Sequence, residues 1–473
     1  MDIFAVSPAD DTKGQTAMQR RTDTVQANST FAVGEEAEQS GAAIIREVGK
    51  VSAPLGVANT ALTPGGTARV DVVVRTRKIG HFFPGGTVDA FDVWLELQGK
   101  DATGRVIYWS GNVTEDGKGP VEPGAHFYRS YQFDQEGNPI DKRNAWQARS
   151  VLYVRLIPPG AADVAHFRVP VPKDAKGPIE FTAKLNYRKF TRYYTQFAYA
   201  GEPKPGQDPA LLGKDHNGME YDFKTIPVNV SGNIRDRIPD LPVITLAQNK
   251  ASIPLGEGNW APVVRKQDRE RWNDWGIGLL LQGDLKGAEY AFRKTTEAEP
   301  EYADGWLNVA RALIQEGETD AAKPFVAKAM ALNPKLGRIW FFQAAIQKAD
   351  GDYDGALRSL FKTRELYPRD RVVLNQIARL LFLKRDFKGA VAMLKEVASV
   401  DPEDVQMHYT AMLAYRGLGD EESAKREETL FRRFKVDEAA QAITERRRMQ
   451  KPEENNERQQ VHEHESAIKG TLR

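Results

Sequence analysis

The chain has 473 residues, of which 41% are hydrophobic and 28% charged, proportions typical of globular domains. Lys plus Arg number 66 and Asp plus Glu 65, so the formal net charge of +1 gives no overall field that would favour nucleic acid or an anionic membrane. Cysteine is absent, which excludes disulfides, thiolate metal sites, cysteine nucleophiles and covalently attached haem within this chain.

Residues 1–65 are predicted to be mostly irregular, with one weak helical stretch, GAAIIREVGK. The first residues lack a basic stretch followed by an apolar run, so a secretory signal is not expected. If Met1 is the true start, the pattern predicts a cytoplasmic protein. We expect no membrane span, because no apolar stretch is long enough for one.

Between residues 66 and 230 apolar and polar residues alternate in short runs separated by Gly- and Pro-rich turns. The clearest run is 179–188, where Ile179, Phe181 and Leu185 alternate with polar residues. This period indicates half-buried strands, and several of them at this spacing predict an antiparallel β-sandwich. Residues 231–268 contain several Pro and Gly and are predicted to be a linker with one short strand, LPVITL.

Residues 269–438 repeat with a period of 34. Pro300 and Pro334 differ by 34 positions (334−300), and Pro368 and Pro402 continue the series. A Trp early in the unit, a central Ala and a Gly followed by an acidic residue recur in phase, a pattern typical of the tetratricopeptide repeat (TPR). We therefore expect an all-α TPR superhelix of five units, namely 269–302, 303–336, 337–370, 371–404 and 405–438. The last unit carries the charged Glu428 at a packing position, as suits a cap.

Residues 439–473 are almost entirely polar and of mixed charge, which predicts a disordered tail. His462 and His464, with the acidic residues beside them, offer the alternative of a weak metal site.

The β-rich region also resembles a known family. The segments IGHFFPGGTVDAFDVWLELQGKDATGR, GAHFYRSYQFDQEGNPI, LIPPGAADVAHFRVPVP and AKLNYRKF resemble the region that follows the haem-bearing part of bacterial multihaem c-type cytochromes, where TPR units often come next. This chain has none of the CxxCH haem sites of that family. The resemblance implies an extracytoplasmic, periplasmic protein with no covalent cofactor of its own, which meets haem only through a partner cytochrome.

The resemblance implies that His81 and then His126 are distal ligands to a haem held by the partner, because a neutral imidazole coordinates iron. The alternative for His81 is a hydrogen bond to a turn carbonyl that orders the FPGG loop. A non-haem metal site of His81, His126 and Asp89 is a further alternative, although no local ligand spacing supports it.

The first helix of each TPR unit is expected to line a concave groove that binds a protein partner or peptide. The groove is predicted to be basic with aromatic patches and to suit a peptide with acidic groups. In the alternative, its arginines pair with acidic residues of neighbouring helices. The groove residues expected from the register are Asn273, Arg311, Phe341, Lys348, Asn375, Arg379, Tyr409 and Arg416.

Phosphate-binding loops and nucleophile elbows are absent from the sequence, so an enzyme is not expected. The pattern predicts a non-enzymatic docking protein whose TPR groove binds a partner and whose sandwich associates with a multihaem cytochrome in electron transfer. The alternative is a general TPR adaptor with a carbohydrate- or protein-binding sandwich and no redox role.

Overall fold

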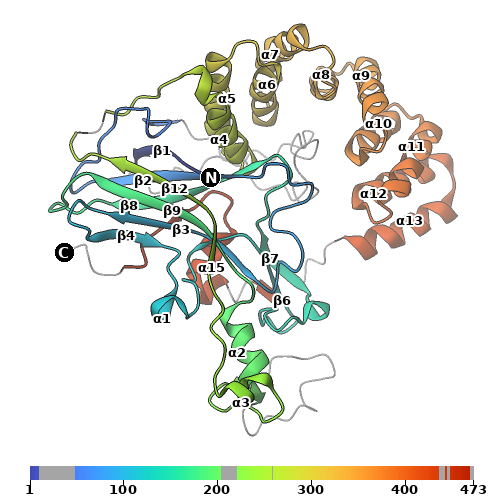
Figure 1. Cartoon of the computed structure of the whole chain (residues 1–473). Coiled ribbons are helices and arrows are strands. Elements are labelled where there is room, and N and C mark those ends of the chain that lie inside the picture. Colours follow the sequence, from blue (N-terminus) through green and yellow to red (C-terminus); the bar gives the residue numbers. More distant parts are fainter. Residues whose placement is uncertain (10–47, 204–220, 258, 436–442, 445–447, 469–473) are drawn as a thin grey trace. The chain divides into compact units, whose positions relative to one another are not determined.

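The computed structural model describes residues 1–9, 48–203, 221–257, 259–435, 443–444 and 448–468 (Figure 1). Contacts divide the chain into two compact units. The first contains the start of the chain, Val48–Val263 and the C-terminal segment Glu438–Arg473, and the second contains Val264–Asp437. In chain order, the second unit is therefore an insertion between two parts of the first.

The first unit is built on two sheets. One has the strand order β1 (Asp2–Pro8), β2 (Thr67–Arg75), β8 (Ala162–Pro170), β13 (Glu463–His464). The other has the order β12 (Ile244–Ile253), β9 (Ile179–Arg188), β3 (Asp92–Lys100), β4 (Val106–Ser110), and β5 (His126–Phe127) pairs with β3. The pairings are antiparallel except that of β13 with β8, which is parallel.

Smaller elements complete this unit. The strands β6 (Ser130–Phe133) and β7 (Ser150–Val154) form a separate antiparallel pair, as do β10 (Glu202–Pro203) and β11 (Tyr221–Asp222). Short helices lie at α1 (Thr114–Gly117), α2 (Arg192–Ala200) and α3 (Ser231–Arg235).

The core of the first unit lies between the two sheets, as the alternation predicts. In β9, Ile179, Phe181, Ala183 and Leu185 are buried. Tyr108 of β4 meets Phe167 of β8 edge to face, with the ring centroids 6.4 Å apart, so an aromatic pair joins the two sheets. The predicted antiparallel sheets are confirmed.

Two edge strands differ from the sequence prediction. β1 lies inside the segment expected to be irregular, and β12, which overlaps the short strand expected at LPVITL, extends further to Ile253 and pairs with β9. Most residues of β12 are exposed or half-buried, so backbone hydrogen bonds rather than apolar side chains hold this strand. An edge strand of this kind leaves little hydrophobic pattern in the sequence. The stretch GAAIIREVGK lies mostly outside the described residues.

The second unit is a run of helix pairs, which confirms the predicted fold class. The pairs are α4 (Arg269–Leu281) with α5 (Leu285–Ala298), α6 (Ala303–Glu316) with α7 (Thr319–Leu332), α8 (Arg338–Ala349) with α9 (Tyr353–Leu366), α10 (Arg371–Leu383) with α11 (Phe387–Val400), and α12 (Val405–Leu418) with α13 (Glu421–Phe434). Among the described residues, none of the helices has the length and apolar character needed to cross a membrane.

The turn between the helices of a pair follows from its sequence. Gly283, for example, has a φ of 79°, a conformation that glycine adopts without strain. The next residue, Asp284, caps α5 by accepting a hydrogen bond from the backbone N–H of Gly287. Asp352, Asp386 and Asp420 cap their helices in the same way.

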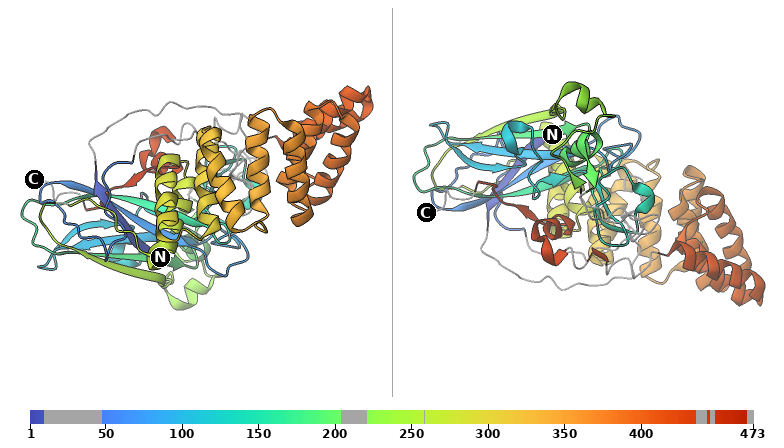
Figure 2. Two further views of the ribbon diagram at one scale, coloured as in Figure 1. Left: turned by 90° about the horizontal axis from the view of Figure 1, so that it is seen from above. Right: turned by 90° about the horizontal axis from the view of Figure 1, so that it is seen from below.

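The C-terminal segment corrects the prediction of a disordered tail over 439–473. Where the structure describes this segment, it forms the helix α15 (Pro452–Arg458) and the strand β13, which lie against the sandwich (Figures 1 and 2). The segment is held by polar contacts rather than by an apolar face: Arg155 pairs with Glu457, and the hydroxyl of Tyr108 donates to the carbonyl of His464. Its polar composition therefore concealed its order.

Candidate functional sites

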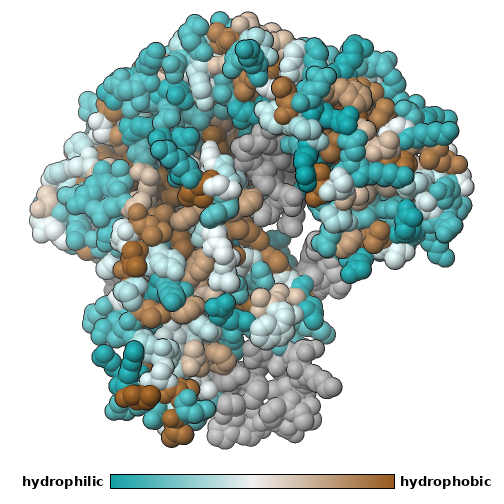
Figure 3. Space-filling model, turned by 45° about the vertical axis from the view of Figure 1, so that its right-hand side comes forward, coloured by the Kyte–Doolittle hydropathy of each residue, from teal (hydrophilic) through white to brown (hydrophobic). Residues whose placement is uncertain are grey.

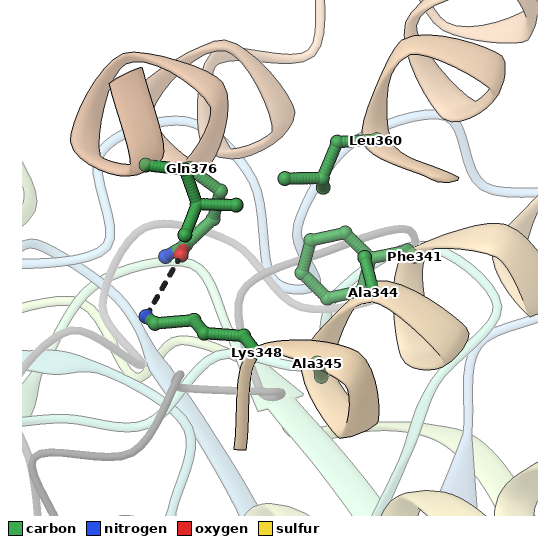
Figure 4. Close-up of a pocket in the computed structure, with 7 residues that line it drawn as sticks. Phe341, Ala344, Ala345, Lys348, Leu360 and Gln376 are labelled. Carbon is green, nitrogen blue, oxygen red and sulfur yellow. Dashed lines mark hydrogen bonds between the residues drawn. The ribbon is translucent and has the colours of Figure 1, made fainter. Parts of the chain in front are cut away.

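A small pocket lies between the helices of the third and fourth pairs of the array (Figure 4). Phe341, Ala344 and Ala345 of α8 form its apolar wall together with Leu360 of α9. Lys348, one turn further along α8, places its ammonium group at the pocket beside Gln376 of α10, whose Oε1 accepts a hydrogen bond from Nζ at 3.5 Å.

Lys348 is the electrostatic feature of this pocket. Burial and the nearby charge of Arg379 lower the pKa of Lys348 from its ordinary 10.5 to about 8. Arg379, on α10, is exposed. A carboxylate would offset one of these two positive charges and reduce their mutual repulsion, so the charges at the pocket favour an acidic group.

The other predicted groove residues have varied surroundings. Asn273 and Arg311 are buried, so they pack the helices instead of lining an open surface, whereas Phe341, which is also buried, forms part of the pocket wall. The side-chain amide of Asn375 donates to Asp404. Arg416 pairs with Glu428 at 2.8 Å, as in the alternative interpretation of the groove.

Tyr409 is 46% exposed and contacts Phe431. The visible surface of the array is mostly hydrophilic, and its hydrophobic residues form small separate patches (Figure 3). Recognition by charge therefore fits this surface better than recognition by a broad apolar groove.

The two histidines predicted as haem ligands lie in different surroundings. His81 is exposed, and its Nδ1 hydrogen-bonds to the carbonyl of Phe82 at 2.7 Å, the turn contact foreseen as the alternative. His126 is only 1% exposed, and both of its ring nitrogens face groups of this chain. A haem held by another protein has no access to His126, which contradicts the prediction for this residue.

His126 instead belongs to a cluster that the sequence did not reveal. One nitrogen each from His126, His462 and His464 and a carboxylate oxygen of Glu457 lie within 4.8 Å of one another. The Nδ1 of His126 is 2.9 Å from the Nε2 of His464. The Oε1 of Glu457 lies 3.2 Å from the Nε2 of His462 and 3.3 Å from the Nδ1 of His464. We call these four residues the histidine cluster.

The histidine cluster is buried and electrostatically strained. Burial lowers the pKa of His126 from 6.5 to about 4, aided by the charge of Arg155, and burial also lowers the pKa of His464 well below its ordinary value. Burial alone would raise the pKa of Glu457, but Arg155 and the two tail histidines outweigh it and hold that pKa well below its ordinary value. These shifts favour neutral imidazoles at His126 and His464 and a charged carboxylate at Glu457, the forms in which these groups bind metals.

The sequence offered only part of this site. The pattern H-E-H at 462–464 is visible in the sequence, but the sequence predicts disorder there and groups His126 with His81 and Asp89 in another ligand set. The sequence carries no signal of the long-range pairing of β13 with β8. This pairing places His464 beside His126, which is 338 positions away in the chain. A polar two-residue strand carries no pattern from which that pairing could be inferred.

The helix pairs belong to a recognised class of repeat. Residues 279–346 match the family model described as tetratricopeptide repeat, so the chain contains a TPR array. No curated protein matches the chain.

Solved structures with similar folds include MamA (residues 41 to the end) from Desulfovibrio magneticus RS-1, with 15% identity over 35% of this chain and 94% of that chain and a TM-score of 0.33. PilF from Pseudomonas aeruginosa has 17% identity over 40% of this chain and 87% of that chain, with a TM-score of 0.34. At these values nothing about the function of this chain follows from the likeness.

Proposed function

We propose that this protein is a non-enzymatic docking protein whose TPR array binds a protein partner through a segment bearing acidic groups. The observation that supports the proposal is the pocket at Lys348, where an apolar wall adjoins two cations, Lys348 and Arg379. An acidic group entering there would relieve the repulsion between the two cations, which gives acidic segments an advantage over neutral ones.

The chemistry of the pocket also indicates the neighbours of the acidic group. Phe341 and Leu360 form the apolar side of the pocket, so we infer that an apolar group beside the carboxylate strengthens binding. The face of the array visible in Figure 3 is mostly hydrophilic, so we infer that the affinity of such a peptide depends on this combination of charged and apolar contacts.

Peptide arrays presenting Leu beside Asp or Glu, probed with the full chain, would test this function. For the best peptide we expect Lys348→Met and Arg379→Met each to weaken binding by about tenfold, as for the loss of one close charge pair. Lys395→Met, which removes an exposed lysine on α11, is the matched control and should leave the affinity unchanged. Equal affinities for all four proteins would exclude this pocket as the binding site.

For the sandwich we propose association with a multihaem c-type cytochrome in an extracytoplasmic electron-transfer system, on the basis of the sequence resemblance around GHFFPGG. The exposed His81 supports this proposal, because its Nδ1–H donates to Phe82 and leaves Nε2 free of a proton for coordination. A pull-down from the native source with a haem absorbance spectrum would test it. A captured cytochrome whose spectrum changes on His81→Ala is expected, and an eluate without haem would leave the general TPR adaptor.

A further inference from the structure

The hydrogen bonds around the histidine cluster fix where each imidazole carries its proton. The Nδ1 of His464 lies 2.9 Å from the carbonyl oxygen of Gly124, and the Nδ1 of His462 lies 2.6 Å from that of Gln459. A carbonyl oxygen only accepts, so in both rings Nδ1 carries the hydrogen and Nε2 has a lone pair. The Nε2 of His126 is 2.8 Å from the Asp163 carboxylate and donates to it, which leaves the lone pair on Nδ1.

These tautomers direct lone pairs at one another. The Nδ1 of His126 and the Nε2 of His464, both without hydrogen, are 2.9 Å apart. The Nε2 of His462 is 3.2 Å from the Oε1 of Glu457, which makes no hydrogen bond among the described residues because the nearby Nδ1–H of His464, at 3.3 Å, donates to Gly124 instead. In a buried site such contacts are repulsive unless a cation lies between the acceptors.

We propose that His126, Glu457, His462 and His464 together bind one divalent transition-metal ion. Three imidazole nitrogens and one carboxylate oxygen suit Zn²⁺ or a neighbouring first-row metal, whereas Mg²⁺ and Ca²⁺ prefer oxygen ligands. Metal–ligand bonds of about 2.0–2.1 Å separate neighbouring ligand atoms by about 3 Å at right angles and about 3.4 Å at the tetrahedral angle. The contacts of 2.9 and 3.2 Å fall near this range. The ligand atoms that are farthest apart, up to 4.8 Å, must move closer together when the ion binds.

The surroundings of the four residues have the features of a metal site. In each histidine the N–H of the other ring nitrogen donates a hydrogen bond to an oxygen of the protein, which orients the imidazole. Arg155 holds the second carboxylate oxygen of Glu457 at 2.6 Å and approaches the Nε2 of His462 at 3.4 Å. Its charge offsets one of the two carboxylates, Asp163 and Glu457, so a divalent ion leaves this group of charges with a formal total of +1.

The four ligands come from two separate parts of the chain, and this gives the ion a structural role. His126 belongs to β5 in the sandwich, whereas the other three ligands belong to α15, β13 and the connection between them. The ion therefore fastens the C-terminal segment to the sandwich after the chain has passed through the whole TPR array. Because the unfolded chain lacks this preformed site, metal binding and the docking of the segment are coupled.

The full chain, purified without a histidine tag, allows a direct test. We expect about one equivalent of bound transition metal by elemental analysis. After chelation, Co²⁺ should bind at one equivalent with the visible absorption of a low-symmetry N- and O-ligated site, and Zn²⁺ should displace it. A folded native chain that binds neither ion at one equivalent would overturn the proposal.

Variants distinguish this site from adventitious binding. Glu457→Gln and His462→Asn keep the approximate side-chain size, and each should abolish the Co²⁺ absorption, whereas the control His81→Ala should retain it. A variant that loses the docked segment also loses the absorption, so the native chain supplies a second measurement. Hydrogen exchange in residues 452–464 should be slower with Zn²⁺ than after chelation by at least tenfold, and equal exchange would contradict the proposed fastening.

Discussion

At the scale of single residues, Lys348 offers a pH-dependent test of the peptide pocket. In the free protein its pKa is about 8, below the ordinary 10.5, through burial and through Arg379 on α10. A bound carboxylate raises that pKa, so its attraction to Lys348 is fully present below about pH 8 and is lost as the pH rises further. We expect the affinity for an acidic peptide to be constant from pH 6.5 to 7.5 and to fall between about pH 8 and 10, as measured by titration calorimetry.

The variant Lys348→Met serves as the control, because guanidinium groups and peptide carboxylates keep their charges over this range. Its affinity should be lower and almost independent of pH. An equal decrease in both proteins would show that another group titrates.

The free energy of unfolding of the protein without peptide depends on pH in the opposite direction. The cost of burying the ammonium group of Lys348 is present in full below about pH 8 and disappears as the pH rises toward 10.5, because over this range the unfolded chain binds more protons than the folded one.

Single residues were also where sequence reasoning was weakest. The TPR register placed Lys348 and Arg379 in the groove, but it equally placed Asn273 and Arg311 there, which the structure buries. The register gives the direction of a side chain from its helix but not the depth at which neighbouring helices cover it. That depth depends on packing between units, which a local pattern does not contain.

At the scale of elements, Gly276 sets how closely α4 and α5 approach. A Cβ at this position would lie 2.6 Å from the ring of Phe292, which is fully buried, so side chains or helices would have to shift. Alanine would gain about 1 kcal/mol of helix propensity over glycine, but overpacking of this kind costs about 1–3 kcal/mol. We therefore expect Gly276→Ala to lower the local stability of the first pair, measured by hydrogen exchange in α4 and α5.

A double-mutant cycle separates the clash from other effects. Phe292→Leu removes part of the ring, so Gly276→Ala should cost less in that background than alone. Additive costs would show that Phe292 is not what opposes the alanine.

Local features also explain why the helix pairs were predictable: the capping residue, the glycine turn and the small packing residues lie within one unit. β1 and β13 lacked such local signals because their partners lie far away in the chain, and only the first residues of β12 carried one.

At the scale of the whole molecule, the C-terminal segment belongs to the first unit although the TPR array precedes it in the chain. Arg155 binds both the carboxylate and the backbone carbonyl of Glu457, at 2.6 and 2.7 Å, and the side chain of Glu457 is fully buried while that of Arg155 is 14% exposed. The hydroxyl of Tyr108 and the backbone N–H of Trp109 add hydrogen bonds to His464 and Ser466. These contacts do not depend on a continuous chain between the array and the segment.

We therefore expect the segment to remain with the sandwich when the chain is cut. Protease sites introduced after residues 263 and 437 of the full chain would separate the two units and the segment once folding is complete. On size-exclusion chromatography residues 438–473 should elute with residues 1–263 and not with the array. Arg155→Met should release the segment, since a buried carboxylate that loses its partner is destabilised by about 3–5 kcal/mol. Lys250→Met removes an exposed pair with Glu180 and should have no such effect. If the segment of the cut protein elutes alone although Arg155 is intact, its attachment requires the continuous chain.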